Sequence, residues 1–414
     1  MNIKYNRNRK SLVLITIFYI LSFTQISFAQ SNSDFTVATP TIRYKLIGTY
    51  DLARLNTILT KEIPEITGDN QAIYTSPKNA VKLYRVEYSS VIPEQNNRPT
   101  IASGLIAIPA TSAKMMPMVS YQHGTVFVKQ QVPSFPEESF ETRLMIAQFA
   151  AQGYVVIGAD YFGMGTSTEK DSYIVLKSQS QASYDMYEAS KVILAKEGIT
   201  PTDFFITGWS QGGVITMSLL EKMEASDVKL KAVGTACAQC DGYIMTNGFL
   251  NFPRKIDAPW VSTMFILTVF SFEEYYQIPG LAQGFFTPEQ YDIARKIYLK
   301  DTSVKIENFP ADLHKLIRSE YFDPQYYKES AYGKLVSEMH PYRWVIKTPV
   351  HMYYGDIDEC LTIGLARLPY EYQKAMGNTK VEAFSAGGDA NHRITYARAV
   401  PQWKKWFDEL ISKK

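Results

Sequence analysis

The chain has 414 residues, of which 46% are hydrophobic and 13% aromatic, which excludes global disorder and is enough for a large core. The 43 basic residues nearly balance the 41 acidic ones, which argues against a nucleic-acid binder that relies on a positive surface. Three cysteines are too few for a disulfide scaffold or a four-cysteine zinc site.

The first 29 residues have the pattern of a secretory signal peptide. Four basic residues precede an apolar run from Leu12 to Phe23, which is shorter than the roughly 20 residues that span a bilayer. Small residues at Ser27 and Ala29 suit signal peptidase, so we predict cleavage after Ala29. The mature protein would then be secreted or periplasmic, with no stable membrane span; the alternative is an uncleaved N-terminal anchor.

The rest of the chain is typical of an α/β protein. After a polar linker at residues 30–40, two β-rich runs flank the Pro/Asn-rich segment VIPEQNNRP, which predicts a hairpin. Apolar runs then alternate with helical periodicity, which predicts a mostly parallel sheet with helices on both faces. The predicted strands are Val81–Ser89, Thr100–Ile108, Met118–Gln122, Tyr154–Ala159, Phe204–Thr207, Leu230–Gly234 and Val350–Tyr354, and the predicted helices are Phe140–Gln152, Ala182–Lys196, Gln211–Glu224 and Ala397–Ile411.

A helical stretch interrupts this alternation at residues 241–344. It is rich in aromatic residues, and its segment Trp260–Phe272 is apolar almost all round, as in a buried helix or the wall of an apolar cavity. We interpret it as a lid inserted between residues 41–240 and 345–414, which form the two parts of one core. The alternative is a second structural domain away from the chemistry.

The strongest functional signal is the segment Gly208-Trp-Ser210-Gln-Gly212. In G-x-S-x-G a serine stands on a strand-to-helix turn so tight that its neighbours carry no side chain. Here a predicted strand precedes the motif and a predicted helix follows it. Ser210 is therefore the candidate nucleophile, against the alternative of an ordinary glycine-rich turn.

A histidine and an acid that could complete a triad follow in the order Ser, acid, His. Among the five histidines, His392 alone follows the candidate acids Asp356 and Asp358, in a polar loop that we expect to be mobile. We prefer Asp358 for its G-x-x-D spacing after the strand Val350–Tyr354, and Asp356 and Asp241 stay open. The alternative for His392 is a surface histidine.

An oxyanion hole is expected where Tyr121-Gln-His123-Gly124-Thr125 follows a strand. Gly124 lets the backbone pass close to Ser210, so the N–H groups of Thr125 and Gln211 are the predicted donors. One such donor is worth about 3–4 kcal/mol of transition-state stabilisation. We interpret His123 as a residue that orients this loop.

Taken in order, the HGT loop, GADYFGMG, GWSQGG, GDID and GGDANHR resemble the α/β-hydrolase superfamily. With the leader and the helical insert, residues 80–410 are most similar to secreted bacterial and fungal secretory-lipase-type esterases. The resemblance implies an α/β-hydrolase fold with a lid, a triad of Ser210, Asp358 and His392, and GADYFGMG as a wall of the cleft. Cys360, beside the acid, departs from the family pattern.

In an oxidising compartment we expect one disulfide that joins Cys360 to Cys237 or Cys240, because it closes a long loop. The C-x-x-C spacing of Cys237 and Cys240 could also indicate a redox pair, but it does not follow the first strand of a thioredoxin-like unit. No residue spacing indicates a metal, nucleotide or other cofactor.

These observations predict a secreted serine hydrolase that cleaves carboxylic esters, with a small-molecule ester or lipid as substrate and no nucleic-acid partner. The alternatives are a secreted peptidase on the same triad and a non-catalytic binding protein on this fold.

Overall fold

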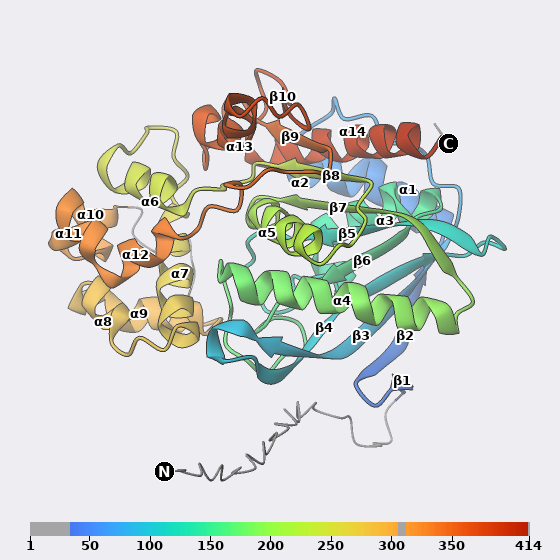
Figure 1. The fold of residues 1–414 in the computed structure, drawn as a ribbon, viewed down its shortest axis with the longest axis horizontal. Helices are drawn as coiled ribbons and strands as arrows, with labels where there is room; N and C mark the ends of the chain where they lie inside the picture. The colour runs from blue at the N-terminus through green and yellow to red at the C-terminus, as the bar shows by residue number, and fades with distance from the viewer. Residues whose placement is uncertain (1–33, 305–311, 413–414) are drawn as a thin grey trace, which may run out of the picture.

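The computed structural model describes residues 34–304 and 312–412, so the predicted leader and residues 30–33 of the predicted linker lie outside the described residues. One ten-stranded sheet organises the described part, in the order β1-β2-β3-β4-β6-β5-β7-β8-β9-β10 (Figure 1). Its strands are β1 (Thr36–Thr39), β2 (Ile42–Tyr50), β3 (Val81–Ile92), β4 (Arg98–Pro109), β5 (Met115–Gln122), β6 (Val155–Ala159), β7 (Thr200–Trp209), β8 (Ala232–Ala236), β9 (Val350–Tyr354) and β10 (Val381–Ser385).

The sheet has an antiparallel half and a parallel half. Strands β1 to β4 form antiparallel pairs, and the hairpin of β3 and β4 lies where the sequence predicted one. Strands β5 to β10 are parallel to their neighbours, and β6 also pairs antiparallel with β4. The prediction of a mostly parallel α/β sheet is confirmed. The short, wholly buried strands β6 and β8 are apolar because helices cover both of their faces.

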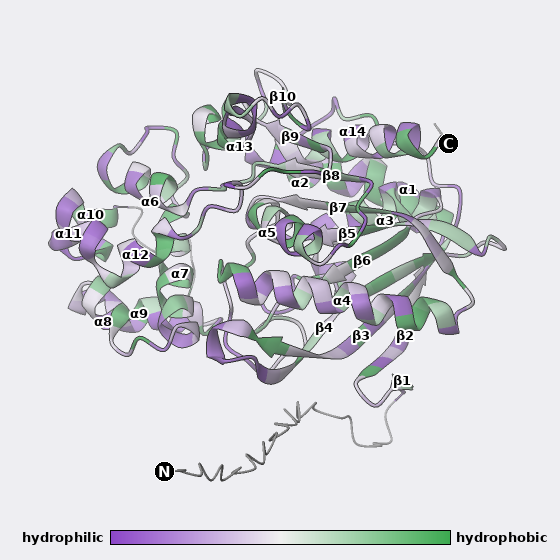
Figure 2. Ribbon diagram, viewed as in Figure 1, coloured by the Kyte–Doolittle hydropathy of each residue, from purple (hydrophilic) through white to green (hydrophobic). Residues whose placement is uncertain are grey.

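Two hydrophobic cores lie on opposite faces of the sheet. Helices α4 (Leu176–Lys196) and α5 (Gln211–Ala225) pack on one face, with Met186 and Leu220 in that core. The other face is covered by α1 (Leu52–Thr57), α2 (Ile63–Thr67), α3 (Phe140–Gln148) and α14 (His392–Ser412), while α13 (Ile363–Ala375) packs on β9 and β10. Hydrophobic residues concentrate in the central strands, whereas α4 and α11 (Pro324–Glu329) carry many hydrophilic residues (Figure 2).

The helices between β8 and β9, which we call the cap, gather at one end of the sheet (Figure 1). Helix α7 (Val261–Tyr275) is its centre, and every residue from Val261 to Phe272 is buried. This burial explains why the segment is apolar all round. The other cap helices are α6 (Gly242–Asn251), α8 (Leu281–Phe285), α9 (Pro288–Tyr298), α10 (Leu313–Leu316), α11 and α12 (Ala331–Ser337).

Polar contacts tie the cap to a loop that follows β6. Lys300 forms a buried ion pair with Asp171 at 2.7 Å, and the Tyr298 hydroxyl donates to the Asp171 carbonyl oxygen at 2.9 Å. The Tyr275 hydroxyl donates to the carbonyl oxygen of the preceding residue, Lys170, at 2.8 Å. These contacts anchor the cap to the loop that follows β6.

Several features differ from the sequence-based predictions, and α4 and α14 each begin five or six residues before the predicted helices Ala182–Lys196 and Ala397–Ile411. Strand β1 lies inside the predicted linker 30–40 and pairs with β2, which the sequence did not predict. Strand β1 is the edge strand and β2 lies next to it, and most of their residues are only partly buried, so they lack the apolar pattern of the central strands. The predicted helix Phe140–Gln152 ends at Gln148, before a separate turn that closes at Gly153 with a φ of 101°.

In the part of the chain that the structure describes, no helix is long and apolar enough to cross a bilayer.

The disulfide prediction is wrong, because Cys237, Cys240 and Cys360 are all free and buried. Cys237 belongs to one hydrophobic core, whereas Cys240 and Cys360 belong to the other. The loop-closure argument concerned only the unfolded chain, whereas a bond also requires matching native geometry. Burial raises the pKa of all three thiols above the ordinary value, which disfavours the reactive thiolate.

We predict that glycine is required at position 234 of β8. A Cβ atom there would lie 2.6–2.7 Å from ring atoms of the buried Trp403, so Gly234→Ala should lower the free energy of unfolding by about 1–3 kcal/mol. Gly248→Ala, in α6, is the control because its Cβ would meet nothing within 4 Å. Denaturant unfolding of the two variants measures the difference, and equal stabilities would contradict the expected clash.

We predict that no cysteine reacts in the native protein and that three react after unfolding. Intact mass after alkylation, with and without denaturant and without prior reduction, measures the number of modified thiols. A single alkylated cysteine under denaturing conditions would show that a disulfide forms after all.

Candidate active site

Ser210 stands on the turn between β7 and α5, and its backbone has φ 57° and ψ −122°. Residues other than glycine rarely adopt a positive φ, so this conformation stores strain of the kind found at nucleophile turns. The two motif glycines make the turn possible. A Cβ at Gly208 would lie 2.2 Å from the Gly212 carbonyl oxygen, and one at Gly212 would lie 1.8 Å from the Gln122 carbonyl oxygen.

A chain of hydrogen bonds joins Ser210, His392 and Asp358. The His392 Nε2 atom lies 2.8 Å from Ser210 Oγ, and its Nδ1 atom lies 2.9 Å from Asp358 Oδ2. All three residues are buried. The Asp358 Oδ1 atom also accepts hydrogen bonds from the N–H groups of Cys360 (2.7 Å) and Leu361 (2.9 Å), which fix the carboxylate.

The pair of His392 and Asp358 is electrostatically coupled. Burial alone lowers the pKa of His392, but the attraction of the Asp358 carboxylate outweighs it, and the pKa is raised above its ordinary value. Burial would raise the pKa of Asp358, but the interaction with His392 and further hydrogen bonds lower it overall. These two pKa shifts favour the ion pair between protonated His392 and Asp358. An imidazole that accepts a proton requires such a stabilised cation.

The two other candidate acids lie elsewhere. Asp356 is exposed and accepts a hydrogen bond from the Ser385 hydroxyl at 2.8 Å. Asp241 caps α6, where it accepts the N–H of Ile244, and it pairs with Arg343 at 3.0 Å. Of the three acids, the structure brings only Asp358 to His392.

The loop before His392, which we expected to be mobile, is held by ion pairs and hydrogen bonds. Arg398 forms ion pairs with Asp69 (2.8 Å) and Asp389 (2.7 Å) and donates to the Ala386 carbonyl oxygen. His392 itself begins α14, its N–H donates to Glu359, and its carbonyl oxygen accepts the indole N–H of Trp209 at 3.0 Å. The imidazole is thus held on a rigid element.

The predicted oxyanion loop passes beside the serine turn. Within residues 34–304 and 312–412, the N–H groups of Thr125 and Gln211 donate to no other protein atom. The N–H of Gln211 belongs to the first turn of α5, where such groups have no acceptor in the helix and the helix dipole favours negative charge. The Gly124 N–H, by contrast, donates to Glu141 at 2.8 Å.

The site opens into a cleft of about 910 Å³. Ser210, His392 and Thr125 line it together with aromatic residues and charged residues. The aromatic residues are Phe127, Phe140, Trp209 and Trp260, and the charged ones are Glu138, Glu141, Glu359 and Arg393. The predicted cleft wall GADYFGMG contributes no residue to this lining; its Tyr161 stacks on His123 beneath the oxyanion loop at a ring distance of 4.2 Å.

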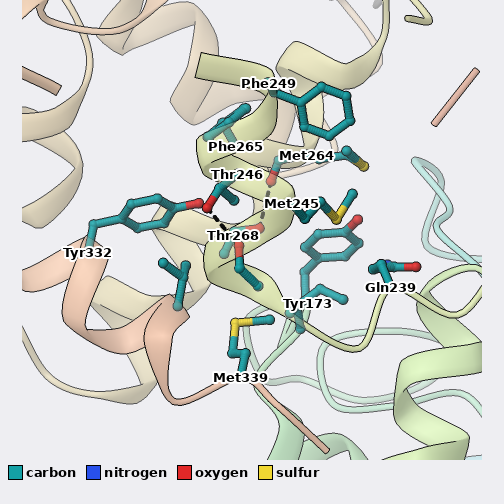
Figure 3. A pocket seen from close by; sticks show the side chains of 13 residues that line it. Tyr173, Gln239, Met245, Thr246, Phe249, Met264, Phe265, Thr268, Tyr332 and Met339 are labelled. Carbon is teal, nitrogen blue, oxygen red and sulfur yellow. Dashed lines mark hydrogen bonds between the residues drawn. The ribbon is translucent and has the colours of Figure 1, made fainter. Parts of the chain in front are cut away.

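A second, smaller cavity of about 40 Å³ lies between the cap and the core (Figure 3). Most of its lining is apolar, and it includes Met245, Met264, Met339, Phe249, Phe265 and Tyr332. Tyr173 and Gln239 separate it from the reacting groups. The Tyr173 hydroxyl hydrogen-bonds the Thr125 hydroxyl at 2.9 Å, and the Gln239 amide nitrogen, turned toward the backbone, lies 3.0 Å from the Ser210 carbonyl oxygen.

In the part of the chain that the structure describes, one set of side chains has the spacing of metal ligands. The donor atoms of Cys237, Asp358 and His392 all lie within 4.8 Å of one another. However, both ring nitrogens of His392 already form hydrogen bonds, to Asp358 and to Ser210, so neither is free to bind a metal. We therefore assign these residues to the hydrogen-bonded triad and not to a metal centre.

Sequence reasoning missed Glu141, Tyr173 and Gln239. Each lies in the site only because the tertiary structure brings α3, the loop before α4 and the segment after β8 to the same edge of the sheet. No motif in the sequence marks any of them.

Comparison with known proteins finds similarity only in structure: no family model and no curated protein matches the chain. A Legionella pneumophila protein provisionally assigned as a hydrolase is 19% identical, with a TM-score of 0.78, over 89% of this chain and 97% of that one. The rice cell wall degrading esterase LipA from Xanthomonas oryzae is 16% identical, with a TM-score of 0.72 over the same shares.

Candida antarctica lipase A in its closed state is 14% identical, with a TM-score of 0.60 over 89% of this chain and 80% of the lipase. Because all three identities lie below 20%, these likenesses establish the fold and leave the reaction to be argued from the site. The chain has the α/β-hydrolase fold, the fold of these lipases and esterases.

Proposed function

We propose that this protein is a serine hydrolase that cleaves carboxylic esters through an acyl-enzyme. The observation that carries the proposal is the unbroken chain of hydrogen bonds from Ser210 through His392 to Asp358, beside a cleft that Ser210, His392 and Thr125 line. The N–H groups of Thr125 and of Gln211, the neighbour of Ser210 in the chain, donate to no other atom of the described residues. This arrangement contains a nucleophile, a base, a residue that orients the base, and a site for negative charge.

The reaction follows from these positions. Ser210 Oγ attacks the ester carbonyl carbon while His392 Nε2 takes its proton, and the charge that develops on the carbonyl oxygen is stabilised by the N–H groups of Thr125 and Gln211. Collapse of this intermediate breaks the ester C–O bond, and His392 returns the proton to the departing alcohol. Water then attacks the acyl-enzyme with His392 again as base, which releases the acid and regenerates Ser210.

The cleft beside Ser210 supports an ester with an apolar acid part. Its aromatic residues suit an acyl chain or an aromatic acid better than a charged group, and they are Phe127, Phe140, Trp209 and Trp260. The wide cleft beside His392 has room for the alcohol part, and its charged rim can contact polar groups. A small-molecule ester or a lipid therefore fits this site better than a highly charged substrate.

The leader predicted at residues 1–29 supports a secreted or periplasmic enzyme. Two of the similar solved structures point to ester chemistry, since one is named an esterase and another a lipase. We therefore prefer an esterase to a peptidase on the same triad.

Hydrolysis of nitrophenyl esters tests the proposal. The wild-type protein should release nitrophenol and react with a fluorophosphonate probe, whereas Ser210→Ala should lose both activities and keep its thermal unfolding temperature, because alanine fits the turn. More than a few per cent residual activity in the variant would overturn Ser210 as nucleophile. Faster cleavage of aminoacyl anilides than of esters would favour the peptidase.

The role of Asp358 is tested by the pH dependence of turnover. The kcat/KM of the wild type should rise with pH through one group whose pKa lies above the ordinary 6.5, because only neutral His392 accepts a proton. Asp358→Asn should lower kcat by roughly 10⁴-fold and move this limb to lower pH, because His392 loses the carboxylate that raises its pKa. Asp356→Asn is the matched control and should change neither quantity; a reversed result would assign the acid to Asp356.

A further inference from the structure

The oxyanion loop turns at Gly124, a residue without a side chain to hold it. Glycine reaches a wide range of φ and ψ, so the direction of the next N–H, that of Thr125, depends on how the two peptide groups at Gly124 are held. Each peptide group is planar and trans, which makes its C=O and N–H point in opposite directions. Holding one end of a peptide group therefore aims the other end.

The peptide group that ends at Thr125 is held through its carbonyl oxygen. The Nδ1 atom of His123 lies 2.8 Å from the Gly124 carbonyl oxygen, and its Nε2 atom lies 3.1 Å from the Asp160 carbonyl oxygen. This contact directs the Thr125 N–H away from the imidazole. It leaves the preceding peptide group free to rotate unless that group is also held.

The preceding peptide group is held by Glu141. Its Oε2 atom accepts the Gly124 N–H at 2.8 Å and also accepts the hydroxyl of Tyr121, which lies in β5. The Tyr161 hydroxyl donates to the opposite end of the same peptide group, the His123 carbonyl oxygen, at 3.2 Å. Because the Gly124 N–H donates to Glu141, it is not a donor to the oxyanion.

Burying the Glu141 carboxyl group beside the oxyanion loop costs free energy, which argues that the group has a specific role. Its residue is 2% exposed, and burial raises the pKa of the carboxyl, with His123 and the hydrogen bonds of Tyr121 and Gly124 acting in the opposite direction. A buried carboxylate is tolerated where it is hydrogen-bonded. Helix α3 also contacts the helix of His392, because the Tyr396 hydroxyl donates to the Glu141 carbonyl oxygen at 3.0 Å.

We propose that Glu141 is a positioning residue that aims the Thr125 N–H at the oxyanion by holding the Gly124 N–H. The proposal rests on the proposed ester hydrolysis and adds to it a residue outside the triad. Glu141 touches no reacting atom in this account. Its effect on turnover passes entirely through the orientation of the loop.

Three substitutions separate the hydrogen bond from the bulk and charge of the side chain. Glu141→Met keeps the length and removes the acceptor, so kcat should fall by about 10²-fold, as after loss of one oxyanion donor. The KM should change by less than about threefold, because the loop acts on the transition state and not on ground-state binding. Glu141→Gln keeps a carbonyl acceptor and should restore most of the lost kcat.

Glu141→Asp keeps the charge but withdraws the acceptor by one methylene group, and it should lower kcat by at least about tenfold. If the Met variant does not fold, the Asp variant tests the role of the hydrogen bond to Gly124 in its place. Thermal unfolding of each variant identifies the folded ones before kinetics are measured.

Glu94→Met is the matched control. Glu94 also has a pKa raised by burial and accepts hydrogen bonds from the Ser178 N–H (3.2 Å) and hydroxyl, but it does not line the cleft. Its loss should lower the unfolding temperature and leave kcat unchanged.

A folded Glu141→Met or Glu141→Asp protein with wild-type kcat would overturn the proposal, and so would a Gln variant as slow as the Met variant. Absence of ester hydrolysis in the wild type would instead remove the proposed function, so the two failures are distinguishable.

Discussion

The close approach of two backbone segments is the constraint on which the rest of the site depends. Gly212 lies so near the Gln122 carbonyl oxygen that a single Cβ atom would reach within 1.8 Å of it. This contact brings the serine turn after β7 against the loop after β5, two strands that pair directly in the sheet. Because Ser210 and the oxyanion loop are joined in this way, the proposed nucleophile and the proposed charge-stabilising groups share one rigid frame.

The remaining groups are fixed relative to that frame by side chains. Trp209, next to Ser210, donates its indole N–H to the His392 carbonyl oxygen and stacks on Tyr396 of the same helix at a ring distance of 5.1 Å. Tyr396 in turn contacts Glu141, which holds the oxyanion loop. A continuous set of contacts therefore links the proposed nucleophile, base and oxyanion donors, and a substitution of any member should affect the others.

The cap completes the site without supplying its chemistry. Its anchor at Asp171 is two residues from Tyr173, whose hydroxyl contacts Thr125, so the same loop supports both the cap and the oxyanion side of the cleft. The apolar cavity forms where this loop meets α6, α7 and α12. The cap and the proposed oxyanion loop thus meet at one short loop.

The sequence by itself determined most strands of the sheet, the serine turn and the choice of Ser210 and His392 as candidates, because glycines at a tight turn, apolar strands and the order of motifs can be recognised in the sequence. The G-x-x-D spacing favoured Asp358, but only the tertiary structure separated it from Asp356 and Asp241, because the three carboxylates have different partners. It also left the three cysteines unpaired and brought Glu141 to Gly124. These outcomes depend on how helices and loops distant in the chain meet at one edge of the sheet, and no local pattern of residues encodes that meeting.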